Sequence, residues 1–212
     1  GSISSTNNIT ITSAGPAISL VDSDNNPDYQ IKNGNGSLRF IDTTNTVDLA
    51  TFTAGEVAIN EGSADVDFRV ESNGKTHMLF VDGGEDLVLI GTGTKSVVSG
   101  GDPGLQVSGN GFDSMIGVTR HDTNAFAAQL MLAKSRNTTV GSNTILQDND
   151  GVGAIGFFAD DGTNLDSQVA YITAEIDGTP GENDTPGALV FSTTADGSAA
   201  VTERMRIDDQ GL

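Results

Sequence analysis

Three stretches of the sequence bring together residue types that could do chemistry, and the first is His121-Asp122 with Ser114 upstream. These are the residue types of a hydrolase triad, in which the histidine activates the serine hydroxyl. Such a serine usually lies in a nucleophile-elbow motif, which is missing around Ser114. A serine, a histidine and an aspartate this close together are common by chance, so the sequence favours a polar strand end. We therefore expect no catalytic residue in this chain.

The second stretch is Leu87-Val-Leu-Ile-Gly-Thr-Gly-Thr-Lys-Ser96, an apolar run followed by a glycine-rich loop and Lys-Ser. A phosphate-binding P-loop needs a glycine directly before the lysine and another five residues earlier, where this chain has Thr94 and Leu89. Ser96 likewise stands where the dinucleotide-binding pattern needs its third glycine. The glycine- and proline-rich residues that follow predict no helix whose N-terminus could bind a phosphate. We expect no nucleotide site and no cofactor.

The third stretch, Asp22-x-Asp24-x-Asn26, begins like a calcium-binding loop. Pro27 stands at position six, where such a loop needs glycine, and Asn33 stands at position twelve, where it needs glutamate. The sequence therefore favours an Asx turn over a calcium site. Two histidines without any cysteine cannot complete a zinc site unless carboxylates join them, so we expect no bound metal. We expect His77 to be a packed or surface imidazole.

Half of the ten basic residues lie in the second half of the sequence, where they share predicted strands with apolar residues. We expect them to pair with acidic side chains of neighbouring chains, because arginine binds carboxylates in a bidentate geometry. A phosphate or carboxylate on a receptor glycan is the alternative partner. These residues are Arg120, Lys134, Arg136, Arg204 and Arg206.

The composition limits the classes of partner. The formal net charge is −19, with 29 acidic and 10 basic residues among 212. Nucleic-acid phosphates and an anionic membrane surface would repel so acidic a chain, so we expect neither as a partner. No apolar run approaches the length that spans a bilayer. With 27 glycines, 5% aromatic residues and no tryptophan, the core must be thin, so self-association is a natural way to bury more apolar surface.

The first half alternates short apolar runs with tight breaks, which predicts an all-β fold. Between Asp65 and Gly93 the apolar runs are separated by Ser72-Asn73-Gly74 and Asp82-Gly83-Gly84. We expect glycine and asparagine to supply the positive φ angles that close these turns. The spacing of the runs is irregular, so we expect stacked or meandering strands without a fixed repeat.

The sharpest break in composition is 100–111, with five glycines and one proline. We place a domain boundary there: a short-stranded β shaft over 1–104 and a C-terminal β domain over 105–212. Residues 124–136 are the one stretch with helical spacing of apolar residues, and we nevertheless expect a strand there. The longer strands predicted in the second domain are Ser114–Arg120, Phe126–Ser135, Val152–Ala159, Gln168–Ile176 and Ala188–Thr194.

Four blocks of the second half resemble successive blocks of a bacteriophage tail-fibre segment, of the kind found in marine phages. They are Leu130-Met-Leu-Ala-Lys-Ser-Arg136, Asp177-Gly-Thr-Pro-Gly181, Pro186-Gly-Ala-Leu-Val-Phe-Ser-Thr-Thr-Ala-Asp-Gly197 and Thr202-Glu-Arg-Met-Arg-Ile-Asp208. The stretch from Asp65 to Gly93 is similar to the same family. In that family the last block often precedes a C-terminal intramolecular chaperone, which is cut off after the trimer forms.

The resemblance implies an elongated homotrimeric fibre in the virion tail, with an intertwined β shaft followed by a β-sandwich or β-prism-like domain. Its function would be to contribute to host recognition and attachment. Its partners would be further copies of itself, other tail proteins, and a host surface glycan or protein. The resemblance implies architecture and assembly and does not imply a particular receptor.

Two alternatives stay open. One is a polysaccharide-degrading tailspike, because glycoside hydrolysis needs only two correctly spaced carboxylates. The other is an adhesin-like extracellular β protein of bacteria, which shares the glycine- and asparagine-rich turns. Among 29 acidic residues a suitable carboxylate pair arises easily and discriminates nothing. Because the aromatic residues that usually hold sugars are few, we expect a protein that is not an enzyme.

Overall fold

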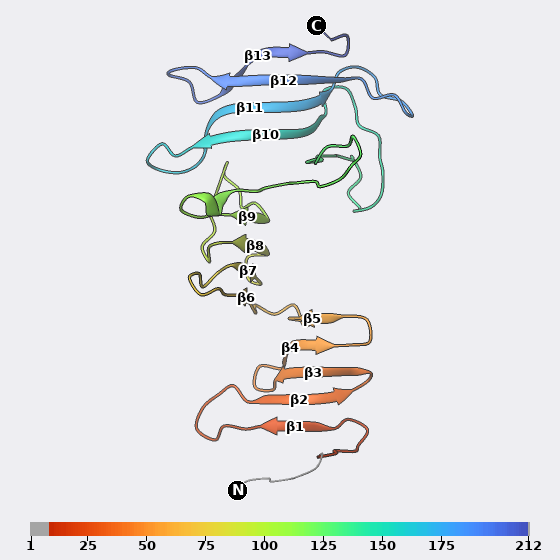
Figure 1. Ribbon diagram of the computed structural model, residues 1–212, viewed down its shortest axis with the longest axis vertical. Helices are drawn as coiled ribbons and strands as arrows, with labels where there is room; N and C mark the ends of the chain where they lie inside the picture. The colour runs from red at the N-terminus through yellow and green to blue at the C-terminus, as the bar shows by residue number, and fades with distance from the viewer. Residues whose placement is uncertain (1–8, 212) are drawn as a thin grey trace. The chain divides into compact units, whose positions relative to one another are not determined.

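The structure is a computed structural model that describes residues 9–211 (Figure 1). The prediction of an all-β protein is confirmed, because these residues form thirteen strands in three sheets, one 3-10 turn at Phe112–Ser114 and no α-helix. The chain divides into two compact units. The first runs to Lys95 and includes Gly104–Ser114, and the second comprises Ser96–Pro103 and the chain from Met115 on.

The first sheet is an antiparallel meander of five strands in chain order. Its tightest turn is Asn35-Gly36, where φ angles of 52° and 79° give the left-handed geometry that two-residue hairpins prefer. Another turn is held by Asp42, whose carboxylate accepts hydrogen bonds from the backbone and side-chain nitrogens of Asn45 at 2.9 and 2.8 Å. The strands are β1 (Ala17–Leu20), β2 (Tyr29–Gly34), β3 (Ser37–Asp42), β4 (Val47–Phe52) and β5 (Val57–Ile59).

The two faces of the first sheet differ in polarity. On one face the Arg39 guanidinium binds the Asp48 carboxylate at 3.2 Å. On the other face the rings of Phe40 and Phe52 meet edge to face with their centroids 6.0 Å apart. This second face is apolar and stays in contact with water, because most of its large side chains are exposed. The exposed ones are Ile18, Leu20, Tyr29, Leu38, Phe40, Phe52, Val57 and Ile59.

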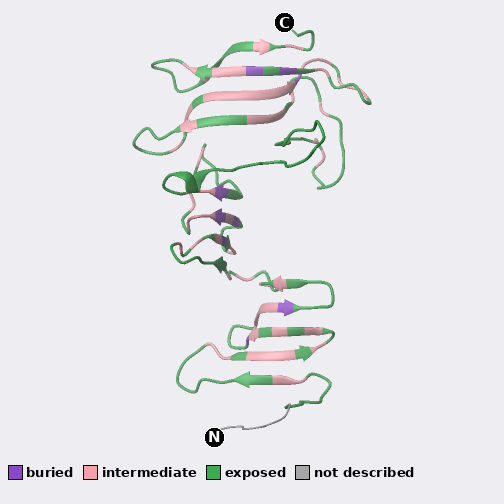
Figure 2. Cartoon of the chain, viewed as in Figure 1, coloured by how far each residue is buried: buried purple, intermediate pink, exposed green. Residues whose placement is uncertain are grey.

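The second sheet holds four strands and contains the best-packed core. The strands are β6 (Phe68–Val70), β7 (Leu79–Asp82), β8 (Leu87–Ile90) and β9 (Leu105–Val107). Strand β9 pairs parallel to β8, whereas the other pairs are antiparallel. On one face Phe80, Leu87 and Leu89 form a buried cluster, with Leu89 fully buried. Figure 2 shows the buried residues of this sheet, in purple, on β7, β8 and β9.

The opposite face of the second sheet is also apolar, and parts of it are exposed. Strand pairing places Phe68, Val81, Val88 and Leu105 in one row across the four strands. Three of these four side chains are exposed, and Leu105 is 58% exposed. The lone chain therefore covers only one face of this sheet.

The role expected for the glycines between β7 and β8 is corrected by the structure. The residue with a positive φ in that turn is Asp86, at 58°, and neither Gly83 nor Gly84 has one. These glycines instead permit close approach. A Cβ on Gly83 would lie 2.7 Å from the Val66 carbonyl oxygen, and one on Gly84 would lie 2.7 Å from the Asp65 carboxylate. The break at Ser72-Asn73-Gly74 also closes without a positive φ.

The third sheet is an antiparallel meander of four longer strands. They are β10 (Gly151–Ala159), β11 (Ser167–Ile176), β12 (Gly187–Thr194) and β13 (Val201–Ile207). Strand pairing places Ile155, Ile172, Phe191 and Met205 in one row across the sheet. This row belongs to an apolar face, and five large side chains of that face are 37–51% exposed. They are Ile155, Phe157, Leu189, Met205 and Ile207.

Three of the five strands predicted in the second half are confirmed, as β10, β11 and β12. The predicted strands Ser114–Arg120 and Phe126–Ser135 are wrong, and residues 124–136 form neither a strand nor a helix. Both segments have apolar residues suited to a strand, but among residues 9–211 no neighbouring strand bonds to them. Strand β13 was not predicted, because charged residues interrupt its apolar alternation.

The domain boundary after Gly104 stays a prediction. In the structure β9 pairs with β8, so Leu105–Val107 belong to the first compact unit. The predicted shaft also includes residues 1–8, which lie outside the described residues. Within 9–211 there is no helix with the length and apolar character needed to cross a membrane.

Candidate functional site

The basic residues of the second unit are positioned by different elements. Arg206 on β13 reaches across β12 and binds Glu175 of β11 at 2.6 Å. It also forms two hydrogen bonds with Glu203, at 3.0 and 3.1 Å. Beneath this pair lie Ala188 and Val190 of β12, which are buried although they belong to the polar face. The hydrogen bonds that Arg206 donates to Glu203 and Glu175 raise its pKa, so it stays charged.

Arg204, its neighbour on β13, makes a weaker contact. Its Nε donates a hydrogen bond to the Thr193 hydroxyl at 2.9 Å. Among residues 9–211, no carboxylate lies within ion-pair distance of Arg204. It is therefore the basic residue of the five with the most freedom to bind an external anion.

Lys134 and Arg136 share one carboxylate, that of Asp150. Arg136 binds it in a bidentate geometry at 2.5 and 2.8 Å, and Lys134 lies 3.7 Å away. Asp150 also accepts a hydrogen bond from the Gln147 backbone at 2.8 Å, and its side chain is only 11% exposed. The Arg136 guanidinium is the main reason that the pKa of Asp150 lies well below its usual range. The group fixes the loop 137–149 to the start of β10.

Arg120 lies in an irregular segment and organises its own neighbourhood. Its guanidinium binds Asp122 at 3.0 Å and Asn124 at 3.2 Å, and it lies 5.5 Å from the centre of the Phe126 ring. The hydrogen bond from Arg120 is the main cause of the lowered pKa of Asp122. Asp122 also accepts backbone hydrogen bonds from the two residues that follow it.

The five predicted residues therefore do not converge on one pocket. Lys134 and Arg136 meet at Asp150, Arg204 and Arg206 are near neighbours on β13, and Arg120 stands apart. Four of the five have acidic partners within the chain. Their use between chains, or toward a receptor, stays a prediction.

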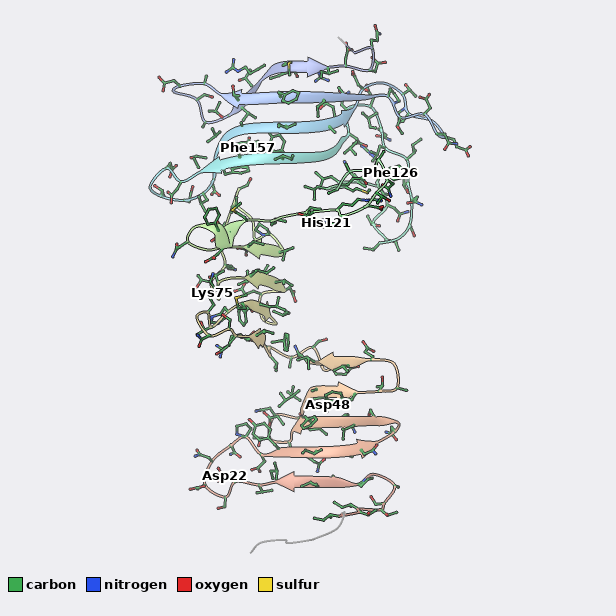
Figure 3. The ribbon with its side chains drawn as sticks, in the orientation of Figure 1. Asp22, Asp48, Lys75, His121, Phe126 and Phe157 are labelled. Carbon is green, nitrogen blue, oxygen red and sulfur yellow. The ribbon has the colours of Figure 1, made fainter. Side chains whose placement is uncertain are left out.

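The triad residue types do not form a catalytic group. The Ser114 hydroxyl donates to the Gly111 carbonyl at 2.9 Å, and Asp122 is bound to Arg120. Figure 3 labels His121, which is exposed. His77 is half-buried, and its ring meets Phe80 edge to face with the centroids 5.1 Å apart. Of the two expected settings for His77, packed or on the surface, the structure shows a half-buried ring in contact with Phe80.

The glycine-rich loop after β8 serves packing. Gly91 has a φ of 84° and lies so close to the Ser108 carbonyl oxygen that a Cβ there would collide with it. A Cβ on Gly93 would lie 2.6 Å from the His77 ring. The approach of Gly91 to Ser108 lets β9 lie beside β8, and close packing accounts for both glycines.

The turn at Asp22 is an Asx turn, as predicted. The Asp22 carboxylate accepts a hydrogen bond from the Asp24 backbone at 3.3 Å, and the side chain of Asp24 contributes most to lowering the pKa of Asp22. Asp28 in turn accepts from the Asp22 backbone at 2.9 Å. Throughout residues 9–211, no cluster of three or more histidine and carboxylate side chains could hold a metal ion.

The surface that sequence reasoning missed is apolar. Each of the three sheets leaves one apolar face exposed, and apolar side chains are also exposed in the irregular segment from Met115 to Ile145. Figure 3 labels Phe126 of that segment and Phe157 of β10. In the first and third sheets the alternation of apolar residues could have identified the faces, because these strands carry their large apolar residues mainly on one side, whereas β7 and β8 carry them on both. It could not show that nothing else in the chain covers them.

The chain matches no protein-family model, and none of the curated proteins matches it.

Proposed function

We propose that this chain is a structural component of a phage tail fibre, which assembles as a homotrimer in the virion tail and contributes to host recognition and attachment. The observation that carries the proposal is the exposed apolar face on every sheet. Within residues 9–211, 33 large apolar residues are exposed and only six apolar residues are buried. A protein that works as a lone chain rarely exposes so much apolar surface.

The exposed area supports the same conclusion. A compact unit of half the chain's mass of 21.8 kDa exposes about 5,600 Å². Two such units, fully separate, would expose about 11,000 Å². This chain exposes 15,422 Å². The excess of about 4,000 Å² is of the size that an obligate assembly buries.

The polarity of the faces favours an assembly of identical chains. In the first and third sheets one face carries ion pairs, Arg39–Asp48 and Arg206–Glu175, and the other is apolar. Three copies that turn their apolar faces to a common axis would bury those faces and leave the charged faces in water. Three single sheets around an axis would make the β-prism that the sequence resemblance implies. The tail-fibre identity itself is supported by the four sequence blocks of the second half.

The decisive experiment is the mass of the purified chain in solution. Size-exclusion chromatography with light scattering should give a mass near three chains. A stable, folded monomer would overturn the proposal. Binding of the assembled protein to host cells, and its loss when host surface glycans are removed, would then test the attachment role.

Within this proposal the chain cuts no polysaccharide. In support, Ser114 and Asp122 each bind other partners, and no cluster of three or more histidine and carboxylate side chains among residues 9–211 could hold a metal ion. After incubation with host capsule or lipopolysaccharide, chromatography should detect no released sugars. New oligosaccharides would instead favour the polysaccharide-degrading alternative.

A further inference from the structure

The irregular segment from Phe126 to Leu132, here called the unpaired segment, is apolar and lies in water. Phe126, Leu130, Met131 and Leu132 are 50–77% exposed. Its residues read Phe-Ala-Ala-Gln-Leu-Met-Leu, without a charge in a chain whose net charge is −19. A sequence this apolar is unusual for a surface loop, because surface loops are normally polar.

The backbone of this segment also lacks backbone hydrogen-bond partners among residues 9–211. Between Met115 and Ser135, within the structure of residues 9–211, no amide or carbonyl group bonds to another backbone group. The next backbone bond along the chain is from Arg136 to Thr144 at 3.2 Å. Backbone groups can bond to water while they are exposed, but they need partners once the neighbouring apolar side chains are buried. A β-strand would satisfy both the backbone and the side chains.

One residue of the segment shows which surface fits it. Leu132 lies against Gly153 of β10, where a Cβ would be 2.6 Å from that of Leu132. Leu132 also lines a shallow hollow of about 160 Å³ with Ile155, Ile172 and Leu189, on the apolar face of the third sheet. The rest of the segment leaves this face exposed. Phe126 and Leu130 share the side of an extended chain with Leu132, so they would extend the same contact.

We propose that the unpaired segment is a β-strand in the assembled protein, and that it docks on the third sheet of a second copy of this chain. This inference rests on the proposed self-assembly and specifies one of its contacts. Among residues 9–211 the outer edge of β10 pairs with no other strand, so it can supply backbone partners. Strand β10 has nine residues, enough for the segment's seven.

Charge and area both permit a second copy of this acidic chain as the partner. The segment and the exposed residues of the face are uncharged, so two acidic chains can meet there without opposing carboxylates. A large apolar residue has about 200 Å² of surface. The four exposed side chains on one copy and the five on the other therefore offer about 1,000 Å² in total, close to the smallest area expected of a specific interface.

The test compares two glutamate substitutions, each at an apolar residue that is exposed in the single chain. Leu130 is 77% exposed and Val140, in a nearby turn, is 102% exposed. Leu130→Glu should weaken self-association at least tenfold, measured by sedimentation over a range of concentrations. Val140→Glu should leave it unchanged. Circular dichroism checks that both variants fold, which is expected because neither side chain is buried in the lone chain.

Hydrogen exchange provides the second measurement. The amides of 127–132 should be protected in the assembled wild type and should exchange freely in dissociated Leu130→Glu. An assembled Leu130→Glu, or free exchange of 127–132 in the assembled wild type, overturns the docking but leaves self-assembly intact. Protection that persists in dilute monomer also overturns it, because the strand would then pair within its own chain. A wild type that never assembles overturns the proposed function as well.

Discussion

At the scale of single residues, some glycines of this chain are required for a positive φ angle, and others because a side chain would collide with neighbouring atoms. Gly36, in the β2–β3 turn, has a φ of 79° and nothing within 4 Å of a Cβ. Gly91, after β8, has a φ of 84° and also lies against the Ser108 carbonyl. The two positions therefore differ in packing while they share the backbone conformation.

We predict that Gly36→Ala costs about 1–2 kcal/mol, the penalty of a left-handed alanine. Gly91→Ala should cost about 3 kcal/mol or more, because β8 and β9 must also move apart. The measurement is guanidinium unfolding followed by circular dichroism at one fixed protein concentration. Equal costs at both positions would show that the contact between Gly91 and Ser108 is not close.

Asp150 is the residue with the largest electrostatic consequence in the second unit. Its carboxylate is bound by Arg136 and by the Gln147 backbone, and its pKa is lowered in the folded chain, first of all by Arg136. A lowered folded-state pKa stabilises the fold above the unfolded pKa, which is about 3.9 for aspartate. That stabilisation is lost as the pH falls through the folded-state pKa.

We therefore predict that Asp150→Asn lowers the thermal midpoint at pH 7 by a few degrees. Between about pH 4 and pH 2 the wild type should lose stability more steeply than the variant. Calorimetry at several pH values measures both. Asp196→Asn, in the exposed turn after β12, is the control and should leave the midpoint and the acid slope unchanged. If Asp150→Asn lost stability with falling pH as steeply as the wild type, Asp150 would not be the cause of the acid sensitivity.

At the scale of elements, the second sheet depends on one small cluster. Leu89 is fully buried against Phe80 and Leu87. Leu89→Ala should cost about 2–5 kcal/mol, because it removes buried apolar surface and leaves a cavity. Leu89→Met keeps the volume and should cost less than about 1.5 kcal/mol. Guanidinium unfolding of both variants checks the difference, and similar losses would mean that the cluster tolerates a cavity.

The same element shows why the first unit could be predicted well. The apolar runs at 66–70, 78–81 and 87–90 became β6, β7 and β8, because tight turns and apolar alternation are local signals. The partner of β8 on its other side is β9, a three-residue strand that returns in parallel. The β9 sequence, Leu-Gln-Val, does not predict this parallel pairing, because the pairing depends on the close approach of Gly91 to Ser108.

The segment Phe126–Ser135 shows the limit of local signals. Its residues suit a strand, yet a strand exists only where another strand bonds to it, and the described part of the chain, 9–211, provides none there. Conversely, β13 forms in spite of three charged residues, because Arg206 finds Glu175 across β12. Such long-range partners also explain why the ion pairs of the candidate site could not be assigned from spacing.

At the scale of the whole molecule, charge and apolar surface act against each other. A net charge of −19 per chain keeps separate copies apart, while the apolar faces and the unpaired segment draw them together. Correct contacts between chains must therefore compete with slow encounter and with wrong pairings at open strand edges. Strands of three to six residues, such as β5, β6 and β9, specify their register only weakly when they pair alone.

We accordingly predict that the denatured protein recovers its native assembly poorly. Unfolding should be slow, so that the stability of the assembled form is kinetic, whereas refolding should be slow and should depend on protein concentration. The experiment is to unfold the protein in guanidinium, dilute it over a range of concentrations, and follow assembly by native gel and strand content by circular dichroism. Rapid, complete recovery that does not depend on concentration would mean that each chain folds alone. The intertwined shaft would then be excluded, because strands that pair between chains cannot form before the chains meet.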